Sequence, residues 1–310
     1  MRRVLVTGAA GFLGRYVARQ FAGQGWEVLG VDRVAPPPGA SCAGEKFVSV
    51  ELPGDDFRDL LRSQQPEALI HCAGSASVPH SMRAPADDYR ANTVLTFELL
   101  DALRVEAPRC AFLLLSSAAV YGNPVSLPVR ETDALLPLSP YGYHKRQAEE
   151  LCAEFARIYG LHTASARIFS SYGPGLRRQV VWDICAKALR GGALRLQGTG
   201  GETRDFIHAT DVARGLHTIL SASPLQGDVY NLSSGREVSI AELAVQLMES
   251  LGVQTALEFD GVNTPGNPLN WRADIEKIRA LGFEPAVSLE AGLREVALWC
   301  AQETAAGEVK

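Results

Sequence analysis

The chain contains no long run of hydrophobic residues. It has 310 residues, of which 46% are hydrophobic, and no apolar segment approaches the roughly 20 residues that a membrane-spanning helix requires. The apolar run near the start, Val4 to Val6, ends at Thr7 and Gly8 and is too short for the hydrophobic part of a signal peptide. We therefore expect no targeting segment and no membrane partner.

Clustered cysteines and an excess of positive charge are also missing. The six cysteines include no CxxC pair and the six histidines show no metal-ligand spacing, so we expect reduced thiols, no metal site and a cytoplasmic location. With 30 basic and 35 acidic residues the net charge is −5, which provides no basic surface for nucleic acid. This length accommodates one large α/β core and a smaller lobe.

The most informative feature present is a glycine-rich turn directly after an apolar strand. In the segment VLVTGAAGFLG, the residues Gly8, Gly11 and Gly14 are spaced three apart, and a helix is expected from Phe12 to Ala22. Gly8 permits a tight turn, Gly11 allows the backbone to approach a pyrophosphate, and Gly14 allows the helix to pack closely. The pattern predicts a dinucleotide-binding turn with the pyrophosphate at the helix N-terminus.

An acidic residue closes the second expected strand. The segment WEVLGVD ends at Asp32, where a carboxylate can accept hydrogen bonds from both ribose hydroxyls of an adenosine. This position favours NAD, because a carboxylate repels the 2′-phosphate of NADP. Arg33 follows directly and can bind that phosphate, so NADP remains an alternative.

Short apolar runs alternate with longer helical patterns in the first half of the chain, which predicts an α/β protein with a Rossmann-type, doubly wound parallel sheet. The expected strands are Val4–Thr7, Glu27–Asp32, Lys46–Glu51, Ala68–Cys72, Cys110–Ser116 and His162–Ile168. After Ile168 the alternation fails and Gly, Pro and Arg become dense. We therefore expect an NAD-binding domain over residues 1–168, to which residues 204–228 return. The remainder of residues 169–310 should form a smaller C-terminal substrate-binding lobe.

Two long helices are expected, from Ala84 to Val105 and from Tyr141 to Tyr159. Each carries an apolar stripe that suits a partner helix, although most such stripes are core. The stripes consist of Val94, Phe97 and Leu100, and of Leu151, Phe155 and Ile158. We expect these helices to form a homodimer.

Serine, tyrosine and lysine residues occur after the expected strands, where an open α/β sheet places its ligand crevice. The segment LLLSSAAVYG ends the fifth expected strand at Ser116 and Ser117, and SPYGYHK places Tyr141 and Lys145 on one helix face. A lysine stabilises a nearby phenolate, as does the charge of an oxidised nicotinamide. We therefore expect the pKa of Tyr141 to be lowered toward neutrality, so that it can exchange a proton with a sugar hydroxyl. A surface helix contact is the alternative interpretation of the Tyr/Lys pair.

Over nearly its whole length the sequence resembles the extended short-chain dehydrogenase/reductase family, in the branch that acts on nucleotide sugars. Besides the motifs above, the resemblance rests on the segments HCAG, YRANT, RIFSSYGPG, ETRDFIHATD, DVYNLSSG and ADIEKIRALGFEP. It implies that Ser117, Tyr141 and Lys145 are the catalytic residues and that Ser117 hydrogen-bonds the reacting hydroxyl or ketone.

The resemblance also implies two sets of binding residues. The cofactor set is Gly8, Gly11, Phe12, Leu13, Gly14, Asp32, Arg33, Glu51, Leu52, Cys72, Ala73, Gly74, Asn92, Tyr141 and Lys145. The set for a nucleotide-sugar substrate is Ser75, Ser117, Ala118, Ser170, Arg178, Arg204 and Arg272. Within these sets, Glu51 is expected near adenine, and Arg204 is expected on the substrate diphosphate.

Two alanines discriminate among the activities of this branch. Nucleotide-sugar 4,6-dehydratases carry an Asp-Glu pair after the catalytic hydroxyl residue, and the related decarboxylases keep the Glu, whereas this chain has Ala118 and Ala119. Without a carboxylic acid to expel a 6-hydroxyl, dehydration is not expected. Asp32 favours an NAD-dependent 4-epimerase that resembles UDP-hexose 4-epimerases and works through a transient 4-keto sugar. Arg33 supports the alternative, a reductase of a GDP- or dTDP-linked 4-keto-6-deoxyhexose.

The nucleotide and the sugar stay open. Where UDP-hexose 4-epimerases have an Asn in FNxYGP and an RxGD segment, this chain has Ser170, and Thr264 with Asn267, so arginines such as Arg178 and Arg272 would have to substitute. A third interpretation is a non-catalytic NAD(P)-binding sensor. It is disfavoured, because such proteins usually lose the Tyr/Lys pair that is present here.

Overall fold

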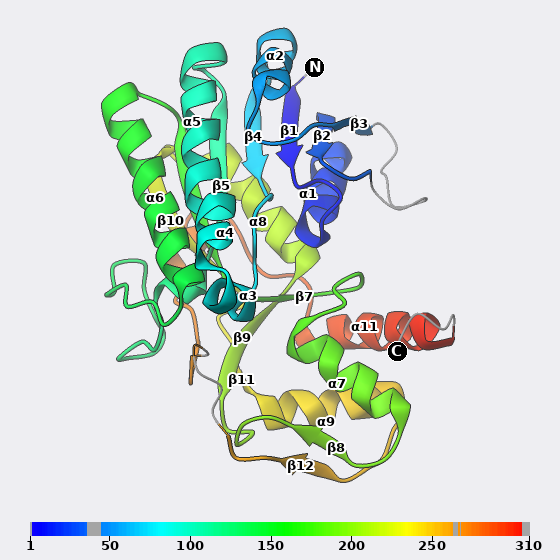
Figure 1. The fold of residues 1–310 in the computed structure, drawn as a ribbon. Helices are drawn as coiled ribbons and strands as arrows, with labels where there is room; N and C mark the ends of the chain where they lie inside the picture. Colours follow the sequence, from blue (N-terminus) through cyan, green and yellow to red (C-terminus); the bar gives the residue numbers. More distant parts are fainter. Residues whose placement is uncertain (1, 36–44, 263–265, 267, 306–310) are drawn as a thin grey trace.

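A computed structural model describes residues 2–35, 45–262, 266 and 268–305 of the chain. Its largest element is a seven-stranded sheet in which all pairings are parallel (Figure 1). From edge to edge the strands are β10 (Gln226–Leu232), β6 (Thr163–Ile168), β5 (Ala111–Ser117), β4 (Ala68–His71), β1 (Arg3–Thr7), β2 (Glu27–Asp32) and β3 (Glu45–Ser49). The strand order reverses between β1 and β4, so the ligand crevice of this doubly wound sheet is expected at their carboxyl ends.

Helices cover both faces of this sheet. On one face lie α1 (Phe12–Gly23) and α8 (Ala209–Ala222), and on the other lie α2 (Asp55–Gln64), α5 (Leu95–Glu106) and α6 (Pro140–Tyr159). Successive residues of a strand point to opposite faces. Val4 and Val6 therefore join the hydrophobic core beneath α1 and α8, while Leu5 joins the core beneath the other three helices.

The prediction of a Rossmann-type parallel sheet is confirmed, and all six expected strands are present with ends within two residues of those expected. Within residues 204–228 the structure is more divided than expected. Helix α8 packs on the large sheet and β10 pairs with β6, but β9 (Thr203–His208) lies in a separate sheet between β7 (Ser170–Tyr172) and β11 (Glu237–Ser239). Because both edges of β9 are already paired, this strand does not join the large sheet.

The smaller lobe combines short strands with three helices around a third hydrophobic core. Its remaining elements are α7 (Gln179–Arg190), β8 (Leu194–Leu196), α9 (Ile240–Leu251), β12 (Leu257–Phe259) and α11 (Leu289–Ala305), whereas α10 (Glu276–Arg279) packs on β10 of the large sheet. Ile184, Leu243 and Leu293, one from each of the three long helices, are fully buried in this core. In Figure 1 the arrowheads of β1 and β4 point toward the lobe, so the lobe lies against the end of the sheet where the crevice is expected.

The first of the two expected long helices is interrupted. After α3 (Val78–Arg83), the helix α4 (Pro85–Tyr89) continues into a π-helical turn (Arg90–Val94) and then into α5. Single π-turns within α-helices are common at functional sites. The π-helical turn is therefore a candidate part of the functional site.

Candidate active site

The glycine turn between β1 and α1 has no room for larger residues. Gly8 has a φ of +67°, and a Cβ on it would lie 2.6 Å from the backbone nitrogen of Ala73, at the end of β4. A Cβ on Gly14 would overlap the carbonyl oxygen of Gly8. Both positions thus require glycine, which leaves the backbone amides of the turn open to a phosphate group.

The Asp32 carboxylate lies at the carboxyl end of β2 and is tied to this turn. Its Oδ2 accepts a hydrogen bond from the Ala10 amide at 3.1 Å, and its Oδ1 accepts one from the Arg33 amide at 2.7 Å. These bonds fix the carboxylate, and each oxygen retains a lone pair for a hydroxyl donor. Arg33 and Glu51 are exposed and Leu52 is partly buried. The turn and the fixed carboxylate together fit the pyrophosphate and the adenosine ribose of NAD.

The amide of Asn92 connects the π-helical turn to the segment that follows β4. Asn92 is 1% exposed, and its Nδ2 donates to the carbonyl oxygens of Asp88 and Ser75, each at 3.1 Å. A Cβ on Gly74 would lie 2.9 Å from the Asn92 Oδ1. The irregular helix is thereby anchored to the chain that borders the crevice.

The structure brings Ser117, Tyr141 and Lys145 to the carboxyl end of β5. Ser117 ends that strand, and its hydroxyl accepts a hydrogen bond from the Ala119 amide at 3.2 Å. Tyr141 and Lys145 occupy the first turns of α6 and are only 8% and 6% exposed. The Lys145 ammonium donates to the carbonyl oxygen of Leu115 at 2.9 Å. All three side chains predicted to be catalytic are thus gathered where the ligand crevice is expected.

Burial dominates the electrostatics of this group. Burial raises the pKa of Tyr141, and the Asp88 carboxylate raises it further. A hydrogen bond with Ser117 and the charge of Arg178 lower this pKa but do not outweigh burial. Burial lowers the pKa of Lys145 to about 8, although the carboxylate of Asp88 acts to raise it. The protein residues alone therefore do not lower the pKa of Tyr141 toward neutrality as expected: burial raises it, and the Lys145 ammonium donates to the Leu115 carbonyl at the end of β5.

Neutral side chains line the floor of the site. His71 is fully buried, and burial together with the Lys145 charge lowers its pKa to about 3. Its Nδ1 lies 2.8 Å from the Thr7 hydroxyl. Burial also raises the pKa of the Cys72 thiol. At neutral pH both groups are uncharged, so neither adds a charge next to Lys145.

A buried ion pair anchors α6 to the sheet behind the catalytic residues. Glu149, one turn beyond Lys145, pairs with Arg167 of β6 at 2.7 Å and accepts a hydrogen bond from Ser116 at 2.5 Å. Arg167 also donates to the Tyr121 hydroxyl at 2.8 Å. Because breaking such a pair leaves an uncompensated buried charge, the helix is held firmly in place.

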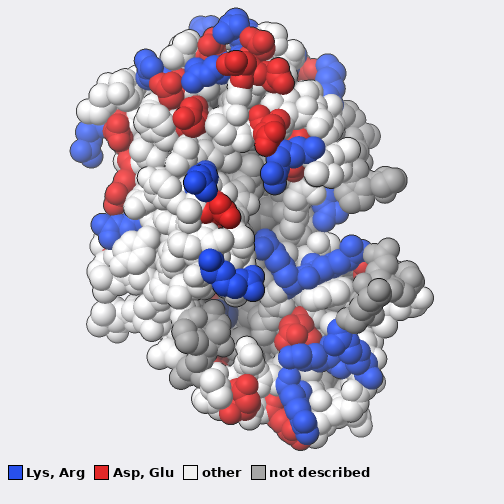
Figure 2. All heavy atoms as spheres, in the orientation of Figure 1, with Lys and Arg blue, Asp and Glu red and all other residues white. Residues whose placement is uncertain are grey.

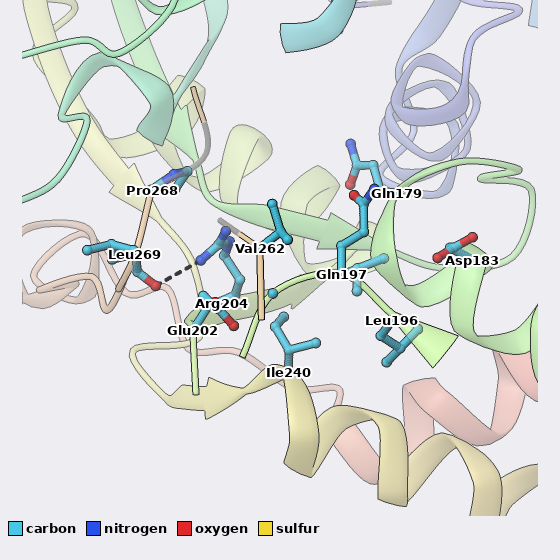
Figure 3. A pocket seen from close by; sticks show the side chains of 12 residues that line it. Gln179, Asp183, Leu196, Gln197, Glu202, Arg204, Ile240, Val262, Pro268 and Leu269 are labelled. Carbon is cyan, nitrogen blue, oxygen red and sulfur yellow. Dashed lines mark hydrogen bonds between the residues drawn. The ribbon is translucent and has the colours of Figure 1, made fainter. Parts of the chain in front are cut away.

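The lobe contains a pocket of about 320 Å³ (Figure 3). Its lining residues are Gln179, Val180, Asp183, Leu196, Gln197, Gly198, Glu202, Arg204, Ile240, Val262, Pro268 and Leu269. Arg204 donates to the carbonyl oxygens of Thr203 at 2.7 Å and Leu269 at 3.1 Å, and its guanidinium lies 5.6 Å from the ring centre of Trp271. Burial lowers the pKa of Arg204 to about 10, so this side chain is still cationic at neutral pH.

The other predicted substrate residues lie outside this pocket. Arg178 immediately precedes α7 and donates to the Ala76 carbonyl at 2.8 Å, and Arg272 donates to the Gly235 carbonyl at 3.1 Å. The three serines and the alanine of this set follow the carboxyl ends of β4, β5 and β6. Thr264 and Asn267 lie outside the described residues. Figure 2 shows basic side chains bordering the hollow between the sheet domain and the lobe, which suits an anionic ligand.

Sequence reasoning missed a buried hydrogen-bonded pair near the residues predicted to be catalytic. Asp88 of α4 is fully buried, and its Oδ2 lies 2.6 Å from the Nδ1 of His144 on α6. His144 directly precedes Lys145 in the motif YGYHK, so its place next to the site was visible in the sequence. Its partner lies 56 residues earlier and could not be identified without the fold.

Comparison with known proteins agrees with this geometry. Residues 4–233 match the profile of the NAD dependent epimerase/dehydratase family. A putative UDP-glucose 4-epimerase from Methanocaldococcus jannaschii is 28% identical over 301 residues, which cover 96% of this chain and 97% of that protein.

Two solved structures are similar over nearly the whole fold. UDP-glucuronic acid 4-epimerase from Bacillus cereus, in complex with UDP-glucuronic acid and NAD, has 27% identity and a TM-score of 0.88, with 97% of this chain and 99% of that chain covered. UDP-glucose 4-epimerase from Thermotoga maritima, with UDP-glucose, has 28% identity, a TM-score of 0.89 and the same coverage. With its glycine turn, its serine, tyrosine and lysine at the end of β5, and a profile match over most of its length, the chain belongs to the NAD-dependent epimerase/dehydratase family.

Proposed function

We propose that this protein is an NAD-dependent nucleotide-sugar 4-epimerase that resembles the UDP-hexose 4-epimerases. The observation that carries the proposal is the group formed by the buried Tyr141 and Lys145 with the partly buried Ser117. Next to this group, Ala118 and Ala119 take the positions where dehydratases hold carboxyl groups. Proton exchange at one sugar oxygen is therefore supported, whereas expulsion of a hydroxyl group is not. The similar proteins crystallised with UDP-sugars and NAD support the same reaction class.

Each catalytic side chain has one role in this proposal. Bound NAD supplies a reversible hydride acceptor for C4 of the sugar. Tyr141 takes the proton of the 4-hydroxyl and returns it after the transient ketone has turned within the site. Ser117 orients the reacting oxygen, and Lys145 stabilises the phenolate of Tyr141 through its charge.

The binding residues are assigned by extension. We assign the cofactor to the glycine turn with Asp32 and to the segments after β3 and β4, and the nucleotide sugar to Arg178, Arg204 and Arg272 with the serines after β4, β5 and β6. Residues 1–168 with 204–228 would form the NAD-binding domain, and the rest of residues 169–310 the substrate lobe. The position of β9 in the lobe sheet supports the assignment of Arg204, which lies near the start of this strand, to the substrate.

A reductase of a nucleotide-linked 4-keto-6-deoxyhexose is the second candidate, because Arg33 is exposed at the carboxyl end of β2 next to Asp32. Both enzymes move a hydride at C4, but only an epimerase takes it from the substrate and gives it back to the same carbon. A nucleotide-hexose deuterated at C4 should therefore yield both epimers with the deuterium retained, as read by mass spectrometry and proton NMR. Loss of the label, or turnover only of a 4-keto sugar with added reduced nicotinamide, would favour the reductase.

The helices α5 and α6 support a homodimer. Leu100 and Phe155 of their apolar stripes point into the core, but Phe97 and Ile158 are 43% and 65% exposed. Val105, next to this surface on α5, is also more than half exposed. We propose that a second copy of the chain covers this face.

The location in the cell also stays a proposal. Among the described residues, no helix is long and apolar enough to span a membrane. Five of the six cysteines are described and all are free, while Cys42 lies outside the described residues. These thiols support a reducing, cytoplasmic environment.

A further inference from the structure

A buried acid and a histidine pack against the catalytic face of α6. Asp88 has no exposed surface, and its Oδ2 lies 2.6 Å from the Nδ1 of His144. His144 follows Tyr141 by three residues on α6, so these two side chains are neighbours on the helix surface, and Lys145 is the next residue along the chain.

The histidine is held in this position by two further contacts. The ring of Tyr89 lies edge-on to the imidazole with 5.3 Å between the ring centres, and the Thr93 hydroxyl donates to the His144 carbonyl at 3.1 Å. Both residues belong to the interrupted helix that also carries Asp88. The π-helical turn therefore carries one side of a preorganised contact with the catalytic helix.

The charge of Asp88 is not explained by packing alone. A fully buried carboxylate is costly unless it is hydrogen-bonded or paired, and the His144 imidazole, 2.6 Å away, is the group placed to compensate it. The second oxygen of the carboxylate, Oδ1, is buried and has no hydrogen-bond partner in the part of the chain that the structure describes. A carboxylate with one oxygen unpaired keeps much of its electrostatic influence on neighbouring groups.

That influence reaches both catalytic side chains. Asp88 raises the pKa of Tyr141, and of all the groups that raise the pKa of Lys145 it has the largest effect. The other titratable or charged groups around these side chains are Glu149 and Cys152 on α6, His71 and Cys72 at the end of β4, and Arg178 at the start of α7. Glu149 is already compensated by Arg167, which leaves Asp88 as the acid that His144 can modulate.

We propose that Asp88 and His144 form a hydrogen-bonded positioning pair that sets the pH range in which Tyr141 and Lys145 work. The inference rests on the proposed role of these two residues in catalysis. Asp88 keeps Lys145 protonated, and His144 limits how far the acid opposes ionisation of Tyr141. Neither residue of the pair contacts the sugar in this account.

The pair can be tested by changing each residue separately, because the two changes should shift the pH profile in opposite directions. Asp88→Asn removes the negative charge, so the alkaline limb of the kcat/KM profile should move to lower pH by about 0.5 to 1 pH unit. His144→Gln exchanges the rigid imidazole for a flexible amide and weakens the contact that compensates Asp88, so the same limb should move to higher pH. The double variant should fall between them, which a loss of packing would not produce.

Asp87→Asn is the matched control. Asp87 adjoins Asp88 in sequence but is exposed and pairs with Arg90 at 3.1 Å, so its removal should leave the profile unchanged. The NAD-loaded protein is used throughout, and circular dichroism verifies that each variant is folded. If Asp88→Asn does not fold, His144→Gln decides alone: a shift to higher pH supports the pair, and no shift overturns it.

A second measurement separates this inference from the proposed reaction. The ionisation of Tyr141 is followed by its phenolate absorbance, as the difference between each variant and the same variant with Tyr141→Phe, and it needs no turnover. The Tyr141 midpoint should fall in Asp88→Asn and rise in His144→Gln. Shifts in the same direction, or no shift in folded variants, would overturn the positioning pair even if the enzyme proves to be an epimerase. The expected shifts without any turnover would instead leave the pair standing and contradict the proposed activity.

Discussion

At the scale of single residues, the proposed chemistry depends on the phenol of Tyr141 and the ammonium of Lys145, whose pKa values burial shifts in opposite directions. Burial raises the pKa of Tyr141 and lowers that of Lys145 to about 8, so each side chain disfavours its charged form when considered alone. Their charges become favourable together, because a phenolate and an ammonium compensate each other. The charge of an oxidised nicotinamide would add to this effect when NAD is bound.

Replacing Tyr141, the proposed proton carrier, should lower kcat far more than replacing Ser117. Tyr141→Phe should lower kcat by roughly 10² to 10⁴ with little change in KM, because it removes the proton-transferring group while leaving most binding contacts. Ser117→Ala should lower kcat less, because it removes only one orienting hydrogen bond. Steady-state kinetics of the two variants make the comparison. A Tyr141→Phe enzyme with nearly full kcat would exclude this helix from the chemistry.

The lysine predicts how activity falls in alkaline solution. Its pKa lies near 8, so the ammonium form dominates below this pH and is lost above it. The kcat of the enzyme should therefore fall as the pH rises through about 8, and Lys145→Met should be slow throughout without this limb. A pH profile from 6 to about 10 measures both. A wild-type profile that stays flat through this range would show that the lysine charge is not needed.

At the scale of elements, the β1–α1 turn is where sequence alone predicted most. The order of strand, glycines and helix is local, so Gly8 and Gly14 could be placed from their spacing. The hydrogen bond from the Asn92 amide to the Ser75 carbonyl, 17 residues earlier, could not be placed from the sequence, because it forms only in the folded chain. The pairing of β9 with β7 and β11 was missed for the same reason, since short strands in the lobe are defined by partners distant in sequence.

Two glycines of α1 test the close packing of this turn. A Cβ on Gly14 would overlap the Gly8 carbonyl, whereas a Cβ on Gly23 would meet nothing within 4 Å. Gly14→Ala should therefore destabilise the protein and abolish NAD binding, while Gly23→Ala should keep NAD binding and be neutral or stabilising by up to about 1 kcal/mol. Thermal unfolding and calorimetric titration with NAD compare them. Equal NAD affinity in both variants would contradict the packing argument.

At the scale of the whole molecule, the proposed site draws on both the sheet domain and the lobe. The proposed catalytic group lies at the carboxyl end of β5 and in the first turns of α6, and the lobe contains a pocket lined in part by Arg204. The catalytic group could be predicted from sequence motifs, because its residues fall in two short segments. Of the twelve residues that line the pocket, only Arg204 was predicted, because the lining comes from α7, β8, β9, α9 and loop segments that meet only in the folded chain.

The central claim is that the hydride returns to the carbon from which it came, so that the cofactor is regenerated within each cycle. The most direct measurement is nicotinamide absorbance during turnover of the protein as purified, with a UDP-hexose and no added reductant, while the sugar products are identified by NMR. We predict interconversion of the C4 epimers without net change in absorbance. Stoichiometric loss of reduced nicotinamide with a 4-keto-6-deoxy sugar, and no epimerisation of any hexose tested, would contradict the account.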